Sequence, residues 1–120
     1  MNGELDIRSR TFRFATRIVR LCQTLDQAPG VSRTLAGQLL RAGTSIGANV
    51  EEAQGGQSKP DFISKLSIAT KEARETHYWL RLLAETKVVP PAQLTELIDE
   101  ADQLVAILTT IVKNSRSNLK

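Results

Sequence analysis

The sequence has few of the residues from which metal sites and covalent catalytic sites are built. Its 120 residues include one cysteine, Cys22, and one histidine, His77. Most metal sites need several such ligands, and a di-iron bundle needs a Glu-x-x-His motif on two helices. Cys22 has no cysteine partner for an internal disulfide, so nothing indicates an oxidising compartment. We therefore expect no metal, no cofactor, no enzymatic activity and a cytoplasmic location.

Long apolar runs are also missing. The longest uncharged stretch covers residues 103–112, whereas a helix needs about 20 residues to span a bilayer. Residues 1–10 carry charges where a signal peptide needs an apolar segment. We expect no membrane partner and one domain over residues 1–120, a length typical of single domains.

Turn-forming residues divide the chain into four helical segments. Ala28-Pro29-Gly30, Gly55-Gly56 and Pro90-Pro91 separate stretches in which apolar residues recur at helical spacing. Ser32 and Ser58 are expected to cap the second and third helices. The predicted helices span residues 5–27, 32–54, 58–86 and 91–114, and residues 115–120 are expected to fray.

Each predicted helix has one continuous apolar face, and the connections between helices are short. Short connections favour antiparallel neighbours. The predicted fold class is therefore all-α, an antiparallel up-down-up-down four-helix bundle.

The second helix carries Gly43 and Gly47 on one face, beside its apolar residues. A glycine inside a helix costs about 1 kcal/mol relative to alanine, so this face is expected to let a neighbouring helix approach closely. The expected neighbour is another helix of the same bundle, and a second subunit is the alternative.

The third helix has a second stripe that is rotated away from its main apolar face. A small monomer rarely exposes such a patch, so we expect a subunit interface here. One wide buried face is the alternative. The stripe consists of Ile68, Glu75, Trp79 and Leu82.

The first helix carries an arginine stripe that suits phosphate binding. Guanidinium groups make bidentate contacts to phosphate, and such contacts are sequence-tolerant and salt-sensitive. The alternative is a solvated helix face partly paired with the fourth helix, whose segment 90–112 has four acidic residues and no basic one. Aromatic residues are too few for a base-stacking platform. The stripe consists of Arg10, Arg13, Arg17 and Arg20.

The remaining reactive groups favour structural roles. Glu72 and Glu75 lie among basic neighbours on one helix, so they are expected to be ion-paired or buried at an interface and not to act as an acid/base pair. Cys22 falls on an apolar face and is expected in the core. His77 is expected at the surface or an interface.

Several motifs resemble a known bacterial family. They are SIGANVEEA at residues 45–53, SKPDF at 58–62, LSIA at 66–69 and KEARETHYWL at 71–80. The pattern is similar to the four-helix bundle proteins of open reading frames in 23S rRNA intervening sequences, to which the accessory variability protein of diversity-generating retroelements is related. The resemblance covers about residues 5–113.

This resemblance implies a homopentameric ring, and for the retroelement relative a basic surface that engages a reverse transcriptase and RNA. It implies no catalytic residues. The family more often has glycine at the position of Ala53. The recurrent polar positions of the family correspond here to Ser45, Asn49, Glu52 and Glu75.

Two expectations follow from these polar positions and from the basic charge. Asn49 or Ser45 is expected to hydrogen-bond Glu75 across a helix pair, because a buried carboxylate needs a partner. The expected function is a non-enzymatic homo-oligomeric bundle that binds RNA or a nucleoprotein partner through a basic surface. The alternative is a structural or protein–protein adaptor without nucleic-acid binding.

Overall fold

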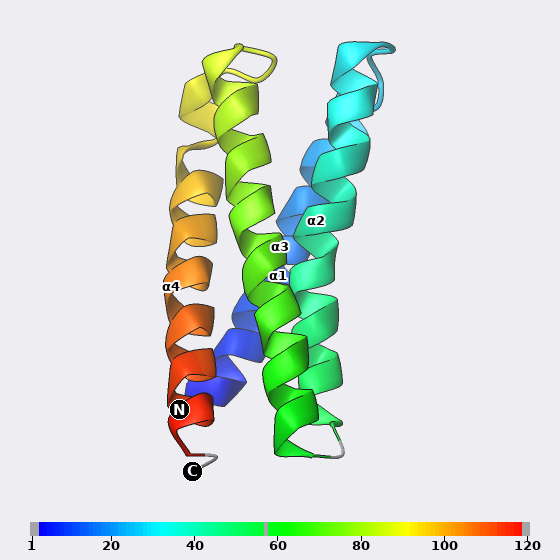
Figure 1. Ribbon diagram of the computed structural model, residues 1–120. Helices are drawn as coiled ribbons and strands as arrows, with labels where there is room; N and C mark the ends of the chain where they lie inside the picture. The colour runs from blue at the N-terminus through cyan, green and yellow to red at the C-terminus, as the bar shows by residue number, and fades with distance from the viewer. Residues whose placement is uncertain (1–2, 57, 119–120) are drawn as a thin grey trace.

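The computed structural model describes residues 3–56 and 58–118, with side chains from residue 7 onward. The helices run alternately up and down as a rod of 49 × 23 × 22 Å (Figure 1). No strand occurs among the described residues, and the predicted all-α four-helix bundle is confirmed. The elements are α1 (Gly3–Leu25), α2 (Val31–Gln54), α3 (Lys59–Glu85), the short 3-10 helix η1 (Pro91–Gln93) and α4 (Thr95–Ser117).

The apolar faces of all four helices meet in one core. Phe14 and Ile18 from α1, Leu80 from α3 and Leu104 from α4 are almost completely shielded from solvent. Burial of side chains of this size contributes about 1.5–3 kcal/mol each. The periodicity of the sequence therefore identifies the faces that hold the bundle together.

The glycine face of α2 packs directly against α1. A Cβ atom on Gly43 would lie 2.8 Å from Cγ2 of Ile18, and one on Gly47 would lie 3.2 Å from the carbonyl oxygen of Thr11. The close approach is thus confirmed, and the neighbouring helix belongs to the same bundle.

The caps of α2 and α3 differ from each other. The Ser58 hydroxyl accepts a hydrogen bond from the Asp61 amide at 3.2 Å, so the predicted cap of α3 is confirmed. The predicted Ser32 cap is wrong, because α2 begins after Gly30, whose φ of 89° favours glycine. The Ser32 hydroxyl instead donates to the Leu25 carbonyl at 3.0 Å and satisfies the end of α1.

The last helix begins and ends later than predicted. Pro91 opens the 3-10 turn, and the α-helix starts only at Thr95. At the other end Ser115 is buried, and the helix continues to Ser117 because its last turn packs against the bundle. The expected fraying is therefore wrong for residues 115–117, and residues 119–120 lie outside the described residues. The first helix also ends at Leu25, two residues before its predicted end.

Candidate functional site

Two arginines of the predicted stripe are bound by acidic residues of α4. Nε and Nη2 of Arg10 donate to the Glu100 carboxylate at 3.0 and 2.7 Å, and Nη2 also donates to Gln103 at 2.9 Å. Arg17 lies 3.7 Å from Glu96. These two guanidinium groups connect α1 to α4.

The other two arginines of the stripe have no side-chain partner among the described residues. Arg13 and Arg20 are exposed, and neither has a hydrogen bond or an ion pair with any residue that the structure describes. They lie seven residues apart on α1, which corresponds to about 10 Å along the helix axis. The stripe is therefore half structural and half available to a ligand.

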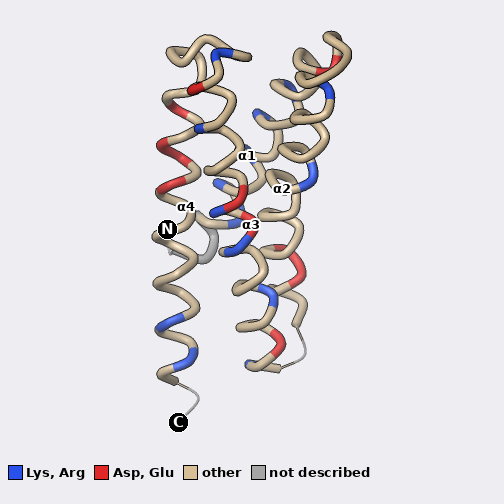
Figure 2. Tube along the Cα trace, turned by 45° about the horizontal axis from the view of Figure 1, so that its top comes forward, with Lys and Arg blue, Asp and Glu red and all other residues tan. Residues whose placement is uncertain are grey.

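Charge is separated along α4, as Figure 2 shows by colour. The acidic side chains lie in its first half, where Glu96 and Glu100 meet the arginines of α1. Lys113 and Arg116 lie in its last turns. The first half of α4 is therefore negatively charged, and its C-terminal end is positively charged.

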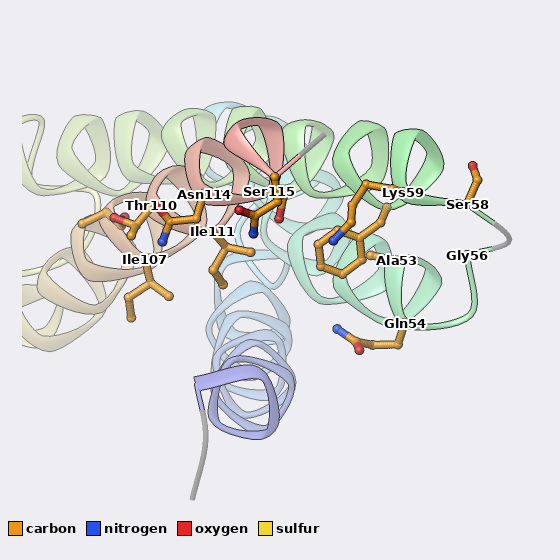
Figure 3. A pocket seen from close by; sticks show the side chains of 13 residues that line it. Ala53, Gln54, Gly56, Ser58, Lys59, Ile107, Thr110, Ile111, Asn114 and Ser115 are labelled. Carbon is orange, nitrogen blue, oxygen red and sulfur yellow. The ribbon is translucent and has the colours of Figure 1, made fainter. Parts of the chain in front are cut away.

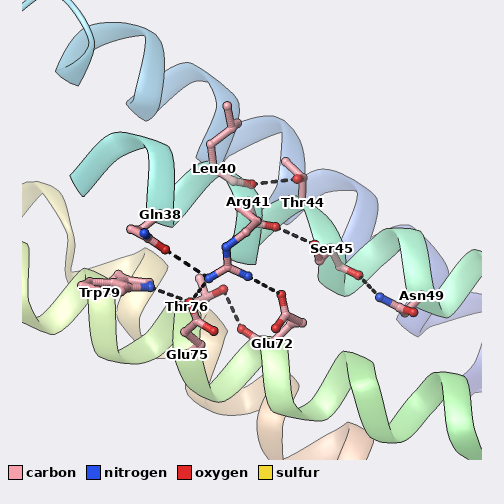
Figure 4. A network of polar contacts seen from close by, with 10 residues as sticks. All are labelled: Gln38, Leu40, Arg41, Thr44, Ser45, Asn49, Glu72, Glu75, Thr76 and Trp79. Atoms are coloured by element: carbon pink, nitrogen blue, oxygen red, sulfur yellow. Dashed lines mark hydrogen bonds and ion pairs between the residues drawn. The ribbon is translucent and has the colours of Figure 1, made fainter. Parts of the chain in front are cut away.

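Arg41 of α2 is the centre of a polar network with α3 (Figure 4). Its Nη1 donates to Glu72 at 3.1 Å, and its Nη2 contacts both Glu75 and Gln38. The Trp79 indole N–H donates to the same Glu75 carboxylate at 2.9 Å. The prediction that Glu72 and Glu75 are ion-paired is confirmed.

This network keeps Glu75 ionised. The hydrogen bond from Trp79, together with the positive charge of Arg41, lowers the pKa of Glu75 below its ordinary 4.5, against the opposing effect of burial. Sequence reasoning missed Arg41. The available signals were an arginine in the middle of the second helix and two carboxylates three residues apart on the third, but the sequence does not show that they face each other.

The expected hydrogen bond from Ser45 or Asn49 to Glu75 is wrong. Ser45 donates to the Arg41 carbonyl at 2.6 Å, and Asn49 donates to the Ser45 carbonyl at 2.8 Å, so both bond within α2. A short polar side chain inside a helix reaches the carbonyl four residues before it, whereas the longer guanidinium crosses to α3.

Of the recurrent polar positions of the family, Glu52 and Glu75 link α2 to α3. Glu52 lies 3.2 Å from the ammonium group of Lys65 on α3, and Glu75 is held by Arg41. The side chains of Ser45 and Asn49 instead donate hydrogen bonds to backbone carbonyls of α2. The recurrent polar positions therefore divide between cross-helix pairing and local hydrogen bonding.

The predicted interface stripe on α3 is partly engaged within the protomer. Trp79 is half-buried, and its ring packs edge-on against Tyr78 at 5.2 Å between centroids. Leu82 is half-buried, whereas Ile68 is 41% exposed. Glu75 and Trp79 thus have partners inside the chain, and a subunit contact at Ile68 and Leu82 stays a prediction.

Cys22 is a core residue, as predicted. Its thiol donates to the Ala36 carbonyl at 3.4 Å, and burial, followed by the negative charge of Asp26, raises the pKa of the Cys22 thiol to about 11. His77 is half-buried on α3. Within the described ranges no three His, Cys, Asp or Glu side chains converge as a metal site would require, and no helix has the length and hydrophobicity to cross a membrane.

A cavity of about 1030 Å³ opens where the ends of α2, α3 and α4 meet (Figure 3). Phe62, Ile107 and Ile111 form its apolar lining, and Lys59 and Asn114 contribute polar groups. Its described lining residues include no carboxylate, imidazole or thiol. The cavity therefore offers space for an apolar group without the usual acid/base side chains.

The chain is similar to proteins of one family. A family model described as 23S rRNA-intervening sequence protein matches residues 3–110. The crystal structure of a Bacteroides thetaiotaomicron protein, described as a protein with unknown function from the S23 ribosomal protein family, is similar with 40% sequence identity and a TM-score of 0.84. The match covers 92% of this chain and 97% of that one. No curated protein has a matching sequence.

Proposed function

This chain belongs to the 23S rRNA-intervening sequence protein family, and we propose that it is a non-enzymatic, homo-oligomeric bundle that binds RNA in the cytoplasm through exposed basic side chains. The family name mentions 23S rRNA. The proposed function is therefore based on the surface chemistry of this chain.

The observation that carries the proposal is the division of the α1 arginines. Arg10 is hydrogen-bonded to Glu100 and Arg17 lies 3.7 Å from Glu96, whereas Arg13 and Arg20 project from the same helix without a partner among the described residues. Unpaired, exposed guanidinium groups bind phosphate without first breaking an internal ion pair. The contact is electrostatic, so the binding would tolerate different RNA sequences.

Exposed apolar side chains on three helices support self-association. Phe12 on α1 is 69% exposed and Leu40 on α2 is 40% exposed, while Ile68 and Tyr78 on α3 are 41% and 50% exposed. A ring needs two different complementary patches on each subunit. A homopentamer, as the family resemblance implies, would repeat Arg13 and Arg20 five times and strengthen weak contacts by avidity.

The test combines the oligomeric mass with RNA affinity. Light scattering gives the mass of the assembly. Fluorescence anisotropy with a labelled structured RNA gives the affinity at about 50 and about 200 mM salt. Arg13→Gln/Arg20→Gln is compared with Lys59→Gln/Lys87→Gln, which removes the same charge from exposed lysines that have no ion pair among the described residues.

The proposal predicts steep salt dependence that is reduced in the α1 variant and kept in the control. No binding by the unchanged protein at about 50 mM salt would contradict it. The adaptor hypothesis, which the exposed Phe12 favours, would then be the better account.

A further inference from the structure

A second basic site lies between α3 and the last turns of α4, apart from the α1 arginines. It is a shallow cleft of about 470 Å³, within the range of ligand sites. Arg74 of α3 and Lys113 and Arg116 of α4 line it, and none of its described lining residues is acidic. Three positive charges therefore share one hollow without a counter-charge in its lining.

These cations differ from Arg10, Arg17 and Arg41, each of which lies within ion-pair distance of a carboxylate. Arg74 and Lys113 are exposed and have neither a hydrogen bond nor an ion pair with the residues that the structure describes. Arg116 makes one long contact, at 3.5 Å, with the Ser67 hydroxyl. The acidic residues of α4 lie in its first half, away from this end (Figure 2).

The α4 helix dipole accounts for only part of this arrangement. Basic side chains near a helix C-terminus are favoured by the dipole, which applies to Lys113 and Arg116. Arg74 lies in the interior of α3 and gains nothing from that effect. Its place beside the two α4 cations adds repulsion, which a bound anion would relieve.

Hydroxyl groups complete the chemistry of the cleft. Ser67 and Thr109 line it, and neither side chain donates a hydrogen bond to another described residue. Guanidinium, ammonium and hydroxyl donors are the groups that contact phosphate oxygens in nucleic-acid complexes. A neighbouring hollow, lined by Ser67, Lys71 and Arg116, extends the basic surface along α3.

We propose that the α3–α4 cleft binds phosphate groups of an RNA backbone through Arg74, Lys113 and Arg116. This inference rests on the proposed function and names a site for it that the α1 stripe does not include. The lining that the structure describes includes no aromatic side chain, so the cleft would hold the backbone without stacking on bases.

The test uses the full-length protein and a fluorescein-labelled single-stranded RNA of about 20 nucleotides, titrated at several salt concentrations. Arg74→Gln/Lys113→Gln removes two unpaired cations from the cleft. Arg13→Gln/Arg20→Gln removes two from α1, and Lys59→Gln/Lys87→Gln is the matched control. Circular dichroism and light scattering establish that each variant keeps its fold and mass.

We expect the cleft variant to bind RNA about tenfold more weakly at low salt, with a salt slope shallower by about 1.4, because each lost contact to a single strand contributes about 0.7. The control should bind like the unchanged protein. Unchanged affinity and slope in the cleft variant, with RNA binding by the wild type intact, would overturn the cleft alone. Absence of RNA binding by the wild type would overturn the proposed function and the cleft together.

Discussion

Arg10 of α1 holds the carboxylate of Glu100 on α4 through two hydrogen bonds of 3.0 and 2.7 Å. Both side chains are largely shielded from solvent. Because α1 packs mainly on α2, this ion pair is one of the few links between the first and last helices. Arg10 is therefore a structural residue, although it belongs to the arginine stripe.

Replacing Arg10 should lower stability and leave RNA binding largely intact. Arg10→Gln should lower the free energy of unfolding by about 1–2 kcal/mol, because Glu100 loses a charged partner. Arg13→Gln should change it by less than about 0.5 kcal/mol and should weaken RNA binding. Urea denaturation and RNA titration of both variants check that Arg10→Gln mainly lowers stability and that Arg13→Gln mainly weakens RNA binding. Equal stability loss in the two variants would contradict it.

A methyl group on the glycine face of α2 should destabilise the bundle. Alanine at Gly43 would place Cβ 2.8 Å from a methyl carbon of Ile18, and overpacking of this kind costs about 1–3 kcal/mol. Gly37 has nothing within 4 Å of such an atom, so Gly37→Ala should gain up to about 1 kcal/mol from helix propensity. Denaturation midpoints of the two variants should therefore move in opposite directions.

Trp79 should report the protonation of Glu75. It is the single tryptophan, and its indole donates to the Glu75 carboxylate. The pKa of Glu75 is lowered, so its ionised form stabilises the fold above pH 4.5, and this contribution is lost as the pH falls through the lowered pKa. Trp79 fluorescence should therefore titrate with a midpoint below 4.5.

Two variants check this assignment. Glu75→Gln should abolish the fluorescence transition. Arg41→Gln should move its midpoint upward, because the carboxylate loses a positive neighbour. A transition that is the same in all three proteins would show that another group is responsible.

Exposed apolar side chains should control the oligomeric mass. Phe12→Glu or Ile68→Glu should shift the assembly toward the protomer in light scattering, because each places a charge on a proposed subunit contact. Val31→Glu is the control, since Val31 is 68% exposed and lies in the first turn of α2, where an acidic residue is favourable. An unchanged mass in both test variants would exclude these patches as contacts.

The sequence was sufficient to predict the fold class, the helix-forming segments and the close approach of a neighbouring helix to the glycine face of α2, but it did not identify that helix as α1. These features follow from the spacing of apolar residues and from Gly43 and Gly47, which lack a side chain and so let another helix come close. Helix ends were less predictable. Ser32 has a capping side chain, but the left-handed backbone of Gly30 sets the start of α2, and packing of Ser115 extends α4.

Cross-helix partners could not be predicted, because they depend on the register between helices. Nothing in the sequence places Arg41 opposite Glu75, or Arg74 beside Lys113, before the helices are packed. The arginine stripe shows the same limit. The spacing of the four arginines predicts one surface, whereas the register of α4 pairs Arg10 with Glu100 and leaves Arg13 without a partner in the described part of the chain.

The most direct test of the account is the salt dependence of RNA affinity for the unchanged protein and for a variant that loses all five of the cations assigned to phosphate binding: Arg13, Arg20, Arg74, Lys113 and Arg116. Five phosphate contacts predict that log K falls with log salt with a slope of about −3.5 for single-stranded RNA. The variant should have a slope near zero, with its mass unchanged. An equal slope in both proteins, or no RNA binding by the unchanged protein at about 50 mM salt, would contradict the account.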